Sequence, residues 1–349
     1  MLQVCRDCIL NKNWEVVEPH ILAVHKQVRN LVDLPSKPPK ADDMNAKLKC
    51  NLCINECVLS KNDLSYCGLR NIPKSQSGEL PLPSRSRGYI HGYLDRIPTN
   101  CCNAWFCSAE YDTYSYAAFL YGCSYNCLSC QNSSHKLFSK KHLFDAEFLA
   151  NQIVKNEKIT CLCYFGGTPE VQLPFSINLA ELIIEKIEKQ DKKRKFRICW
   201  EFNGSGRQDL VEKCMRLAIK TGGNIKFDLK TFNEKLNIAL CGVSNSRTLE
   251  NFKYLAENFF NTRGKYMPEM SACTLMVPGY TNHKEVELIA RFISEINPEI
   301  PYNLLVFHGD YQMKDLPITP RKQAEKCIET AKKYLKNVHL GNKFLLGFS

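Results

Sequence analysis

Three closely spaced cysteines are the residues of this chain that indicate chemistry most strongly. Cys123, Cys127 and Cys130 follow the pattern C-x3-C-x2-C on one short segment. Three thiolates at this spacing can hold three corners of a cubic iron–sulfur cluster, and no fourth cysteine follows at once, so one iron would remain open to a further ligand. The alternative is a zinc site completed by a distant fourth ligand.

A second group of cysteines lies upstream. Cys50, Cys53, Cys57 and Cys67 follow the pattern C-x2-C-x3-C-x9-C. Four thiolates of this kind suit either tetrahedral zinc or a fully ligated iron–sulfur cluster, and the spacing does not choose between them. The surrounding stretch, 47–112, is rich in Cys, Pro and Gly and has few periodic segments. We expect a metal to hold its shape.

The remaining cysteines give weaker signals. The chain has 19 in total, which is many for a protein that lacks the short length and signal-peptide pattern of a secreted disulfide scaffold. Cys5, Cys8, Cys101, Cys102 and Cys107 form sets with too few members to close a metal site, so they either join other sets in space or stay free. The others read as small buried hydrophobic residues: Cys161, Cys163, Cys199, Cys214, Cys241, Cys273 and Cys327.

Composition places few limits on function. Of the 349 residues, 44% are hydrophobic and 24% are charged, as in ordinary globular proteins. No run approaches the roughly 18 apolar residues that a membrane span needs, and we expect a cytoplasmic protein. The net charge of +11 permits contact with nucleic acid without requiring it. The basic run at 189–195 is interpreted as a solvated loop.

The elements that would position the cysteines follow a repeating order. Strands are expected at 117–121, 160–165, 196–202, 224–229, 271–277 and 302–307, with a short final strand at 337–340. Helices are expected at 145–157, 177–190, 208–221, 246–259, 284–296 and 320–335, the last with Thr319 as its N-cap. Such alternation predicts an α/β fold with parallel strands joined by helices. Six units indicate a partial (βα)6 barrel like that of triosephosphate isomerase, with its site at the C-terminal ends of the strands.

The chain divides into three predicted regions. Residues 1–46 hold a helix at 19–32 followed by a linker rich in Pro and Lys, residues 47–112 form the cysteine-rich metal-binding segment, and residues 113–349 form the barrel.

Polar and glycine residues follow several of the expected strands. The second strand is followed by Gly166, Gly167, Thr168 and Pro169, and two adjacent glycines allow backbone to approach a ligand closely. Other strand ends carry Asn203, Asp228, Lys230 and His308. A carboxylate can accept hydrogen bonds from hydroxyl groups, and an ammonium group can donate them to a carboxylate.

The segment 121–132, with its cysteine triad, resembles the radical S-adenosylmethionine (SAM) superfamily, in particular the branch of pyruvate formate-lyase-activating enzyme. The upstream cysteine segment is similar to that of activating-enzyme-like proteins related to the AmmeMemoRadiSam group. The resemblance covers about 115–345. It implies a [4Fe–4S] cluster on Cys123, Cys127 and Cys130, reductive cleavage of SAM to a 5′-deoxyadenosyl radical, and hydrogen abstraction from a substrate. It also implies an electron donor such as ferredoxin or flavodoxin.

The resemblance carries over to the SAM-binding residues. It implies that Gly166, Gly167, Thr168 and Pro169 lie at the amino group of the methionine moiety, with Thr168 in place of the usual acidic residue. It implies that Asn203, Asp228 and Lys230 hold the ribose and the carboxylate, and that His308 lies near adenosine. Two further positions depart from the family: Ser129 replaces an aromatic residue, so Tyr125 is a candidate for packing against adenine, and Cys273 stands near a usual basic position.

The substrate is left open by the sequence. A glycyl-radical enzyme or another protein substrate, RNA, and a small molecule are all compatible with the resemblance, because it concerns the SAM site rather than the substrate site. A different class of function, a non-catalytic zinc-binding protein, remains an alternative at this point.

Overall fold

A single curved sheet forms the centre of the computed structural model, which describes residues 2–11, 13–42, 44–45, 47–71, 83–98, 101, 103–190, 194–264 and 267–347. The sheet has nine strands in this described part of the chain. In spatial order they are β11 (Val338–Gly341), β10 (Tyr302–Val306), β9 (Met270–Met276), β8 (Ile225–Asp228), β7 (Arg197–Phe202), β6 (Ile159–Gly166), β4 (Tyr114–Leu120), β3 (Arg87–Arg96) and β5 (Leu143–Asp145). From β4 to β11 neighbouring strands are parallel, while β3 pairs antiparallel with both β4 and β5.

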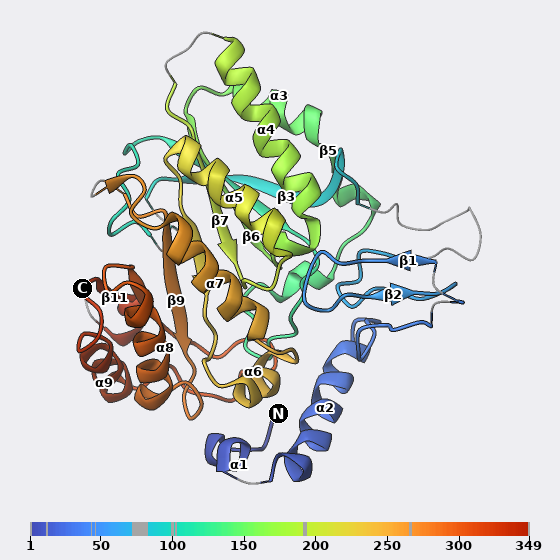
Figure 1. The fold of residues 1–349 in the computed structure, drawn as a ribbon, viewed down its shortest axis with the longest axis vertical. Coiled ribbons are helices and arrows are strands. Elements are labelled where there is room, and N and C mark those ends of the chain that lie inside the picture. The colour runs from blue at the N-terminus through green and yellow to red at the C-terminus, as the bar shows by residue number, and fades with distance from the viewer. Residues whose placement is uncertain are drawn as a thin grey trace.

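Helices connect the parallel strands and cover the outer face of the sheet (Figure 1). They are α3 (Ala146–Lys155), α4 (Leu173–Lys189), α5 (Gln208–Thr221), α7 (Ser246–Phe259), α8 (His283–Ile296) and α9 (Arg321–Ala331). The apolar faces of these helices and the strands form one large core, in which Trp200, Phe202 and Phe227 are fully buried. Because the sheet ends at β11 and β5 without closing, the architecture is the partial α/β barrel that the sequence predicted.

Short elements surround this core. One short helix, α6 (Glu234–Cys241), follows β8 at the C-terminal end of the strands. The two-stranded sheet of β1 (Leu48–Lys49) and β2 (Val58–Leu59) lies beside the barrel (Figure 1). Turns of 3-10 helix occupy Ser133–Lys136, Lys140–His142, Pro169–Gln172 and Lys343–Leu346. No helix in the described ranges is long and apolar enough to cross a membrane.

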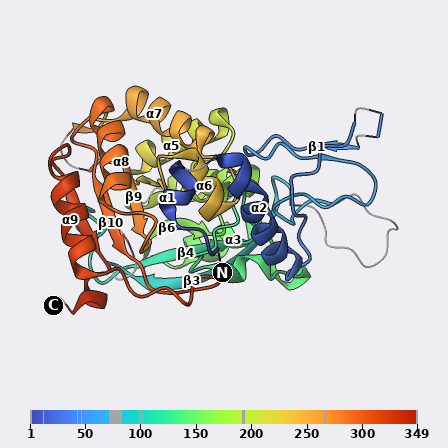
Figure 2. The ribbon, with the colours of Figure 1, turned by 90° about the horizontal axis from the view of Figure 1, so that it is seen from below.

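Two N-terminal helices pack beside α6, at the end of the barrel where the parallel strands terminate (Figure 2). They are α1 (Arg6–Asn11) and α2 (Trp14–Asn30). The predicted helix began at Pro19, but α2 starts five residues earlier, where the Asn13 side chain caps it by accepting from the amide of Glu15. Its buried side chains join the same apolar cluster as Leu128, which lies between Cys127 and Cys130.

One local prediction is wrong. Thr319 is not the N-cap of α9, because the cap position is Pro320 and no side chain caps that helix. The Thr319 hydroxyl instead donates to the carbonyl of Met276 at 2.8 Å and accepts from the amide of Phe307 at 2.8 Å. These two hydrogen bonds join the end of β9 to the end of β10. The Thr319 side chain thus makes a tertiary contact in place of the predicted cap of α9.

Candidate functional site

The segment with the cysteine triad is held by the backbone on both sides. At its start Gly122 has φ +78°, where a Cβ would meet the Leu69 side chain at 2.7 Å, so glycine is needed. Further along, the amides of Asn126 and Leu128 donate to the carbonyls of Cys241 and Leu240, at 2.8 and 2.9 Å. These carbonyls belong to the last turn of α6 and would otherwise lack a partner. The triad therefore has a shape that backbone contacts fix.

The glycine pair after β6 lies directly against this segment. A Cβ on Gly167 would come within 1.9 Å of the carbonyl oxygen of Gly122, and Gly166 has φ +111°. The amide of Thr168 donates to that same Gly122 carbonyl at 3.2 Å. The two glycines thus let two strand ends approach each other, in addition to leaving room for a ligand.

The three thiols of the triad line one pocket of about 220 Å³, which we call the SAM pocket after the ligand that the sequence resemblance leads us to expect there. Burial raises the pKa of Cys123 well above its usual value. A hydrogen bond from the Cys241 thiol lowers the pKa of Cys127 to about 7, against the effect of burial. The backbone amide of Tyr125 and the side-chain amide of Asn203 approach the Cys123 sulfur at 3.4 and 3.8 Å.

The triad supplies the sulfur donors that an iron–sulfur cluster needs, but its three thiols are not already arranged around a metal position. Thiolates are the ligands of such clusters, and N–H groups directed at sulfur tune them. In the described part of the chain, no group of three or more His, Cys, Asp and Glu side chains is already arranged to hold a metal ion. What the chain supplies is three thiols on a fixed loop beside a pocket.

A network of opposite charges forms another wall of the SAM pocket. Lys230 contacts Asp228 at 2.8 Å, and Lys226 contacts Asp228 at 3.6 Å and Glu201 at 2.9 Å. Burial would raise the pKa of Asp228, but the two lysines outweigh it and lower that pKa below its usual range. The Cys273 thiol donates to the same carboxylate. The wall therefore holds ionised groups of both signs.

The structure brings five of the eight predicted SAM residues to this pocket: Gly166, Gly167, Asn203, Asp228 and Lys230. Thr168, Pro169 and His308 are not among the residues that line it. The side chain of Thr168 is buried and donates to Glu170, which also accepts from the amide of Gly204 at 2.6 Å. Thr168 thus joins the end of β6 to the end of β7.

Several lining residues were not singled out from the sequence. Lys226 and Glu201 point into the pocket from the interiors of β8 and β7, and His135 and Gln131 come from the segment after the triad. Lys226 could have been found, because it precedes Asp228 by two positions and so shares its face of the strand. Tyr125 lines the pocket as expected of an adenine-packing candidate, with its hydroxyl 2.8 Å from that of Thr248.

The upstream cysteine group is linked through its backbone, because the amide of Cys50 donates to the carbonyl of Cys57 at 2.8 Å, but within the described residues no three of its thiols are arranged to hold a metal ion. Cys53, Cys57 and Cys67 are buried and Cys50 is half-buried. Burial, and secondarily the nearby thiol of Cys67, raises the pKa of Cys57 to about 11. Three N–H donors reach these sulfurs: the amide of Tyr66 contacts Cys57 at 3.4 Å, the side-chain amide of Asn55 contacts Cys53 at 3.8 Å, and Nη1 of Arg70 contacts Cys67 at 3.9 Å. Such donors are typical of metal-bound thiolates.

A third group of thiols lines a cavity of about 110 Å³ inside the barrel, which we call the thiol cavity. Its cysteines are Cys101, Cys107, Cys161, Cys163 and Cys199. The sulfurs of Cys161 and Cys199 are 4.0 Å apart. Phe165 and Glu201 line both this cavity and the SAM pocket, so the two adjoin. Of the cysteines whose role the sequence left open, Cys102 lies outside the described residues.

Comparison with known proteins decides the family. Residues 118–293, half of the chain, match the model of the radical SAM superfamily. The chain belongs to the radical SAM superfamily. Membership implies an enzyme with a [4Fe–4S] cluster and SAM.

Two relatives and one solved structure are named as activating enzymes. The chain is 26% identical over 224 residues to a protein of Methanocaldococcus jannaschii named as a glycyl-radical enzyme activating enzyme, covering 62% of this chain and 77% of that one. It is 32% identical over 144 residues to the isethionate sulfite-lyase activating enzyme of Desulfovibrio desulfuricans, covering 41% of this chain and 40% of that one. A solved domain of a pyruvate-formate lyase-activating enzyme from Bacteroides vulgatus is 19% identical, with a TM-score of 0.37, and covers 48% of this chain and 94% of that one. This TM-score is too low to carry an argument.

Proposed function

We propose that this radical SAM enzyme cleaves SAM reductively and abstracts a hydrogen atom from a protein substrate, as an activating enzyme of a glycyl-radical enzyme. One observation carries the SAM chemistry: the three thiols of the triad line the same pocket as Asp228 and Lys230. The choice of a protein substrate is supported by two relatives that are named as activating enzymes. Because the family shows an enzyme, a non-catalytic zinc-binding protein is not retained as an alternative.

The residues of the pocket have separate tasks. When bound, the cluster, once reduced by an external electron donor, would supply one electron to SAM, whose sulfur–C5′ bond would break to give methionine and a 5′-deoxyadenosyl radical. Lys226 and Lys230 provide ammonium groups for the carboxylate of the methionine moiety, and Asp228 accepts from ribose hydroxyls. Gly166 and Gly167 leave their backbone open to a close approach. Tyr125, Leu275 and Val277 line the same space and restrict water.

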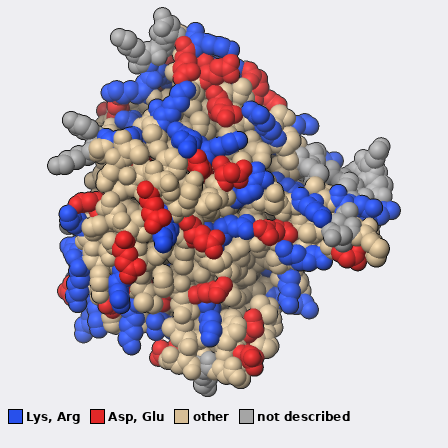
Figure 3. Space-filling view, viewed as in Figure 1, with Lys and Arg blue, Asp and Glu red and all other residues tan. Residues whose placement is uncertain are grey.

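The thiol cavity is the proposed place of the reacting group of the substrate. It adjoins the SAM pocket at Phe165 and Glu201, and its lining is largely apolar, with Ile97, Pro98 and Ala117 among its residues. A small uncharged group, such as the methylene of a glycine, suits a cavity of about 110 Å³. The net charge of +11 keeps RNA as an alternative substrate, and on the face seen in Figure 3 acidic and basic side chains are interspersed.

The first experiment tests SAM cleavage. The protein is reconstituted anaerobically with iron and sulfide, reduced with dithionite and given SAM, and 5′-deoxyadenosine is measured. We expect product from the wild type and from Cys214→Ala, whose thiol is fully buried in the core away from the pocket. Cys127→Ala should give none. Equal product from Cys127→Ala would overturn the proposal.

A second experiment tests the thiol cavity as the substrate site. Ala117→Leu fills part of the cavity, where Ala117 is 6% exposed. The variant should still cleave SAM. It should no longer generate the radical signal in electron paramagnetic resonance when the enzyme is mixed with a glycyl-radical enzyme that the wild type activates. An undiminished signal would mean that the substrate binds elsewhere.

A further inference from the structure

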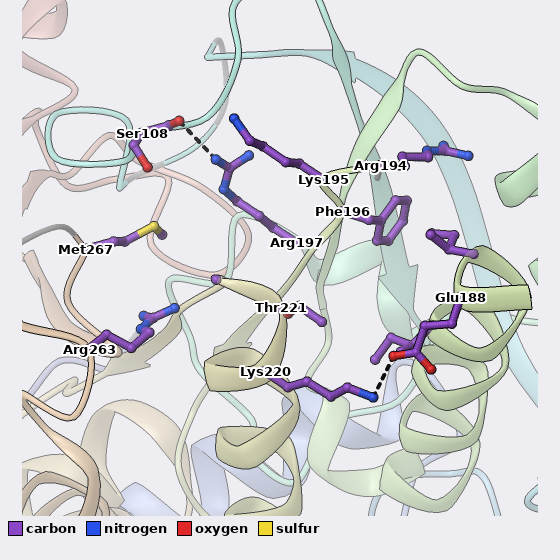
Figure 4. Close-up of a pocket in the computed structure, with 13 residues that line it drawn as sticks. Ser108, Glu188, Arg194, Lys195, Phe196, Arg197, Lys220, Thr221, Arg263 and Met267 are labelled. Carbon is purple, nitrogen blue, oxygen red and sulfur yellow. Dashed lines mark hydrogen bonds and ion pairs between the residues drawn. The ribbon is translucent and has the colours of Figure 1, made fainter. Parts of the chain in front are cut away.

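A second polar pocket lies at the opposite end of the sheet from the SAM pocket. Its 13 lining residues are drawn in Figure 4, and its volume is about 470 Å³; we call it the basic pocket. Arg197 opens β7, Thr221 ends α5, and Ser108 precedes β4. Because Asn203 follows the other end of β7 and lines the SAM pocket, the six residues of that strand, roughly 20 Å, separate the two sites.

The basic pocket has more positive than negative charge. Its cations are Arg194, Lys195, Arg197, Lys220 and Arg263, and its lining includes one carboxylate, Glu188. Three of these cations already have hydrogen-bond or ion-pair partners. Lys220 turns to Glu188 at 2.9 Å, as Figure 4 shows, Lys195 lies 3.2 Å from Glu110, and Arg194 donates to backbone carbonyls.

The other two cations, Arg197 and Arg263, each have N–H groups without a hydrogen-bond acceptor among the described residues. Arg197 is 8% exposed, and its Nη2 donates to the carbonyl of Ser108 at 3.0 Å. Arg263 donates from Nη2 to the carbonyl of Gly223 at 2.8 Å, and its Nε lies 3.6 Å from Glu269. Within the part of the chain that the structure describes, Nη1 of Arg197 and both Nε and Nη1 of Arg263 are buried without a hydrogen-bond partner.

Buried N–H groups without an acceptor are uncommon in proteins, and a bound water or ion is one of the explanations for them. Here the groups belong to two arginines that line one pocket. Planar guanidinium groups bind phosphate oxygens through paired hydrogen bonds, which an ammonium group cannot match. The pocket is also larger than a single phosphate ion, so it leaves room for an organic part next to the charged end.

We propose that the basic pocket binds a phosphate monoester, whose oxygens accept hydrogen bonds from Arg197 and Arg263. The same contact acts on the thiol cavity. Arg197 holds the backbone of Ser108, and the residues on either side of it, Cys107 and Ala109, line that cavity. A ligand that fixes Arg197 therefore fixes one wall of the thiol cavity. This inference does not depend on the proposed radical chemistry.

The test is a binding measurement on the full chain at constant ionic strength. Glycerol 3-phosphate, inorganic phosphate and sodium chloride are each titrated by isothermal calorimetry. We expect glycerol 3-phosphate to bind at one site and chloride to give no saturable heat. A signal equally strong for inorganic phosphate would assign the site to the free ion and overturn the monoester proposal.

Variants then locate the site. Arg263→Gln and Arg197→Lys should each weaken binding by about tenfold or more, because each loses a forked guanidinium contact. Lys322→Gln, which removes an exposed cation of α9 outside the pocket, should bind as the wild type does. Equal loss in all three variants would show non-specific attraction and overturn the assignment.

A second readout follows the thiol cavity. Alkylation of Cys107 by iodoacetamide, followed by mass spectrometry, should slow at least severalfold when glycerol 3-phosphate is present, and Cys5, which is exposed, should react at an unchanged rate. An unchanged rate at Cys107 would overturn the link between the two cavities.

Discussion

Asp228 lies between two ammonium groups, and this position makes it the central charge of the SAM pocket. Lys230 is 2.8 Å and Lys226 3.6 Å from its carboxylate. We expect Asp228→Asn to weaken SAM binding by about 10- to 100-fold, because a hydrogen bond to a charged group is lost and Lys230 loses its ion-pair partner. Equilibrium dialysis of labelled SAM against the cluster-loaded protein measures this. Asp209→Asn, which changes an exposed carboxylate paired with Arg207, is the matched control and should bind normally.

A second prediction concerns the lack of room for a side chain at Gly167. An alanine Cβ would lie 1.9 Å from the Gly122 carbonyl oxygen, so Gly167→Ala should displace the segment of the triad and lower the iron content after reconstitution. Gly222→Ala is a useful comparison, since Gly222 has φ +73° and no atom within 4 Å of the added carbon. It should cost only about 1 kcal/mol of folding free energy and leave the iron content unchanged. Full iron loading of Gly167→Ala would contradict this reading.

The triad itself could be recognised from the sequence because its spacing is local. The remaining pocket residues could not all be found this way. Lys226 could be inferred from its two-residue spacing to Asp228, whereas Glu201 lies within a strand, where a side chain's direction depends on the register of the whole sheet. The thiol cavity is a stronger case: Cys101 and Cys107 come from a loop and Cys161 and Cys199 from two strands, so only the tertiary fold joins them.

Helix α2 depends on a histidine that links it to the site. His25 lies 3.1 Å from the carbonyl of Ala239 in α6 and 2.9 Å from the side-chain amide of Asn126. Burial lowers the pKa of His25 to about 4. The unfolded chain takes up a proton near pH 6.5, and the folded chain does so only near pH 4. Stability is therefore complete above pH 6.5 and is lost as the pH falls toward 4.

We expect this histidine to contribute about 3 kcal/mol to the fall in unfolding free energy between pH 7 and 4. Urea unfolding at several pH values measures the slope. His25→Gln should flatten it, whereas His20→Gln, at an exposed position, should leave it unchanged. A slope in His25→Gln as steep as in the wild type would show that other groups govern the acid sensitivity. His135, whose pKa burial lowers to about 3, accounts for part of the remaining slope.

The elements that the sequence predicted well are those with a repeated pattern. Strand and helix alternate from β4 onward, and α5 and α7 have the predicted bounds. The antiparallel strand β3 was not predicted, because it precedes that repeat and its buried positions do not alternate regularly. The helix α6 was not predicted either, because it is short. Its place depends mainly on its contacts with α1, α2 and the segment of the triad.

The chain as a whole is expected to carry two separate metal centres. The upstream group of Cys50, Cys53, Cys57 and Cys67 is proposed to hold zinc or a second cluster. Cys53→Ser should then lose one metal equivalent, by elemental analysis, while the cluster signal of the triad in electron paramagnetic resonance persists. Cys214→Ala, in the core, should keep both. If Cys53→Ser retains the full metal content, the upstream group is structural without a metal.

The division into three regions at 46 and 112 remains a prediction. What the structure adds is that the N-terminal helices share an apolar cluster with Leu128, Leu240 and Phe307 near the SAM pocket. Substitutions in α1 or α2 are thus expected to reach the chemistry through packing, although these helices contribute no residue to the lining of that pocket.

The backbone bonds from Asn126 and Leu128 to the last carbonyls of α6 join atoms of the polypeptide only, so iron and sulfide are not among their partners. A chain that has lost its inorganic cube, for example after exposure to oxygen, would consequently keep the receptacle in shape. Repair would then require only that iron and sulfide be replaced, without refolding of the polypeptide. We expect the cell's assembly machinery to carry out this repair in place.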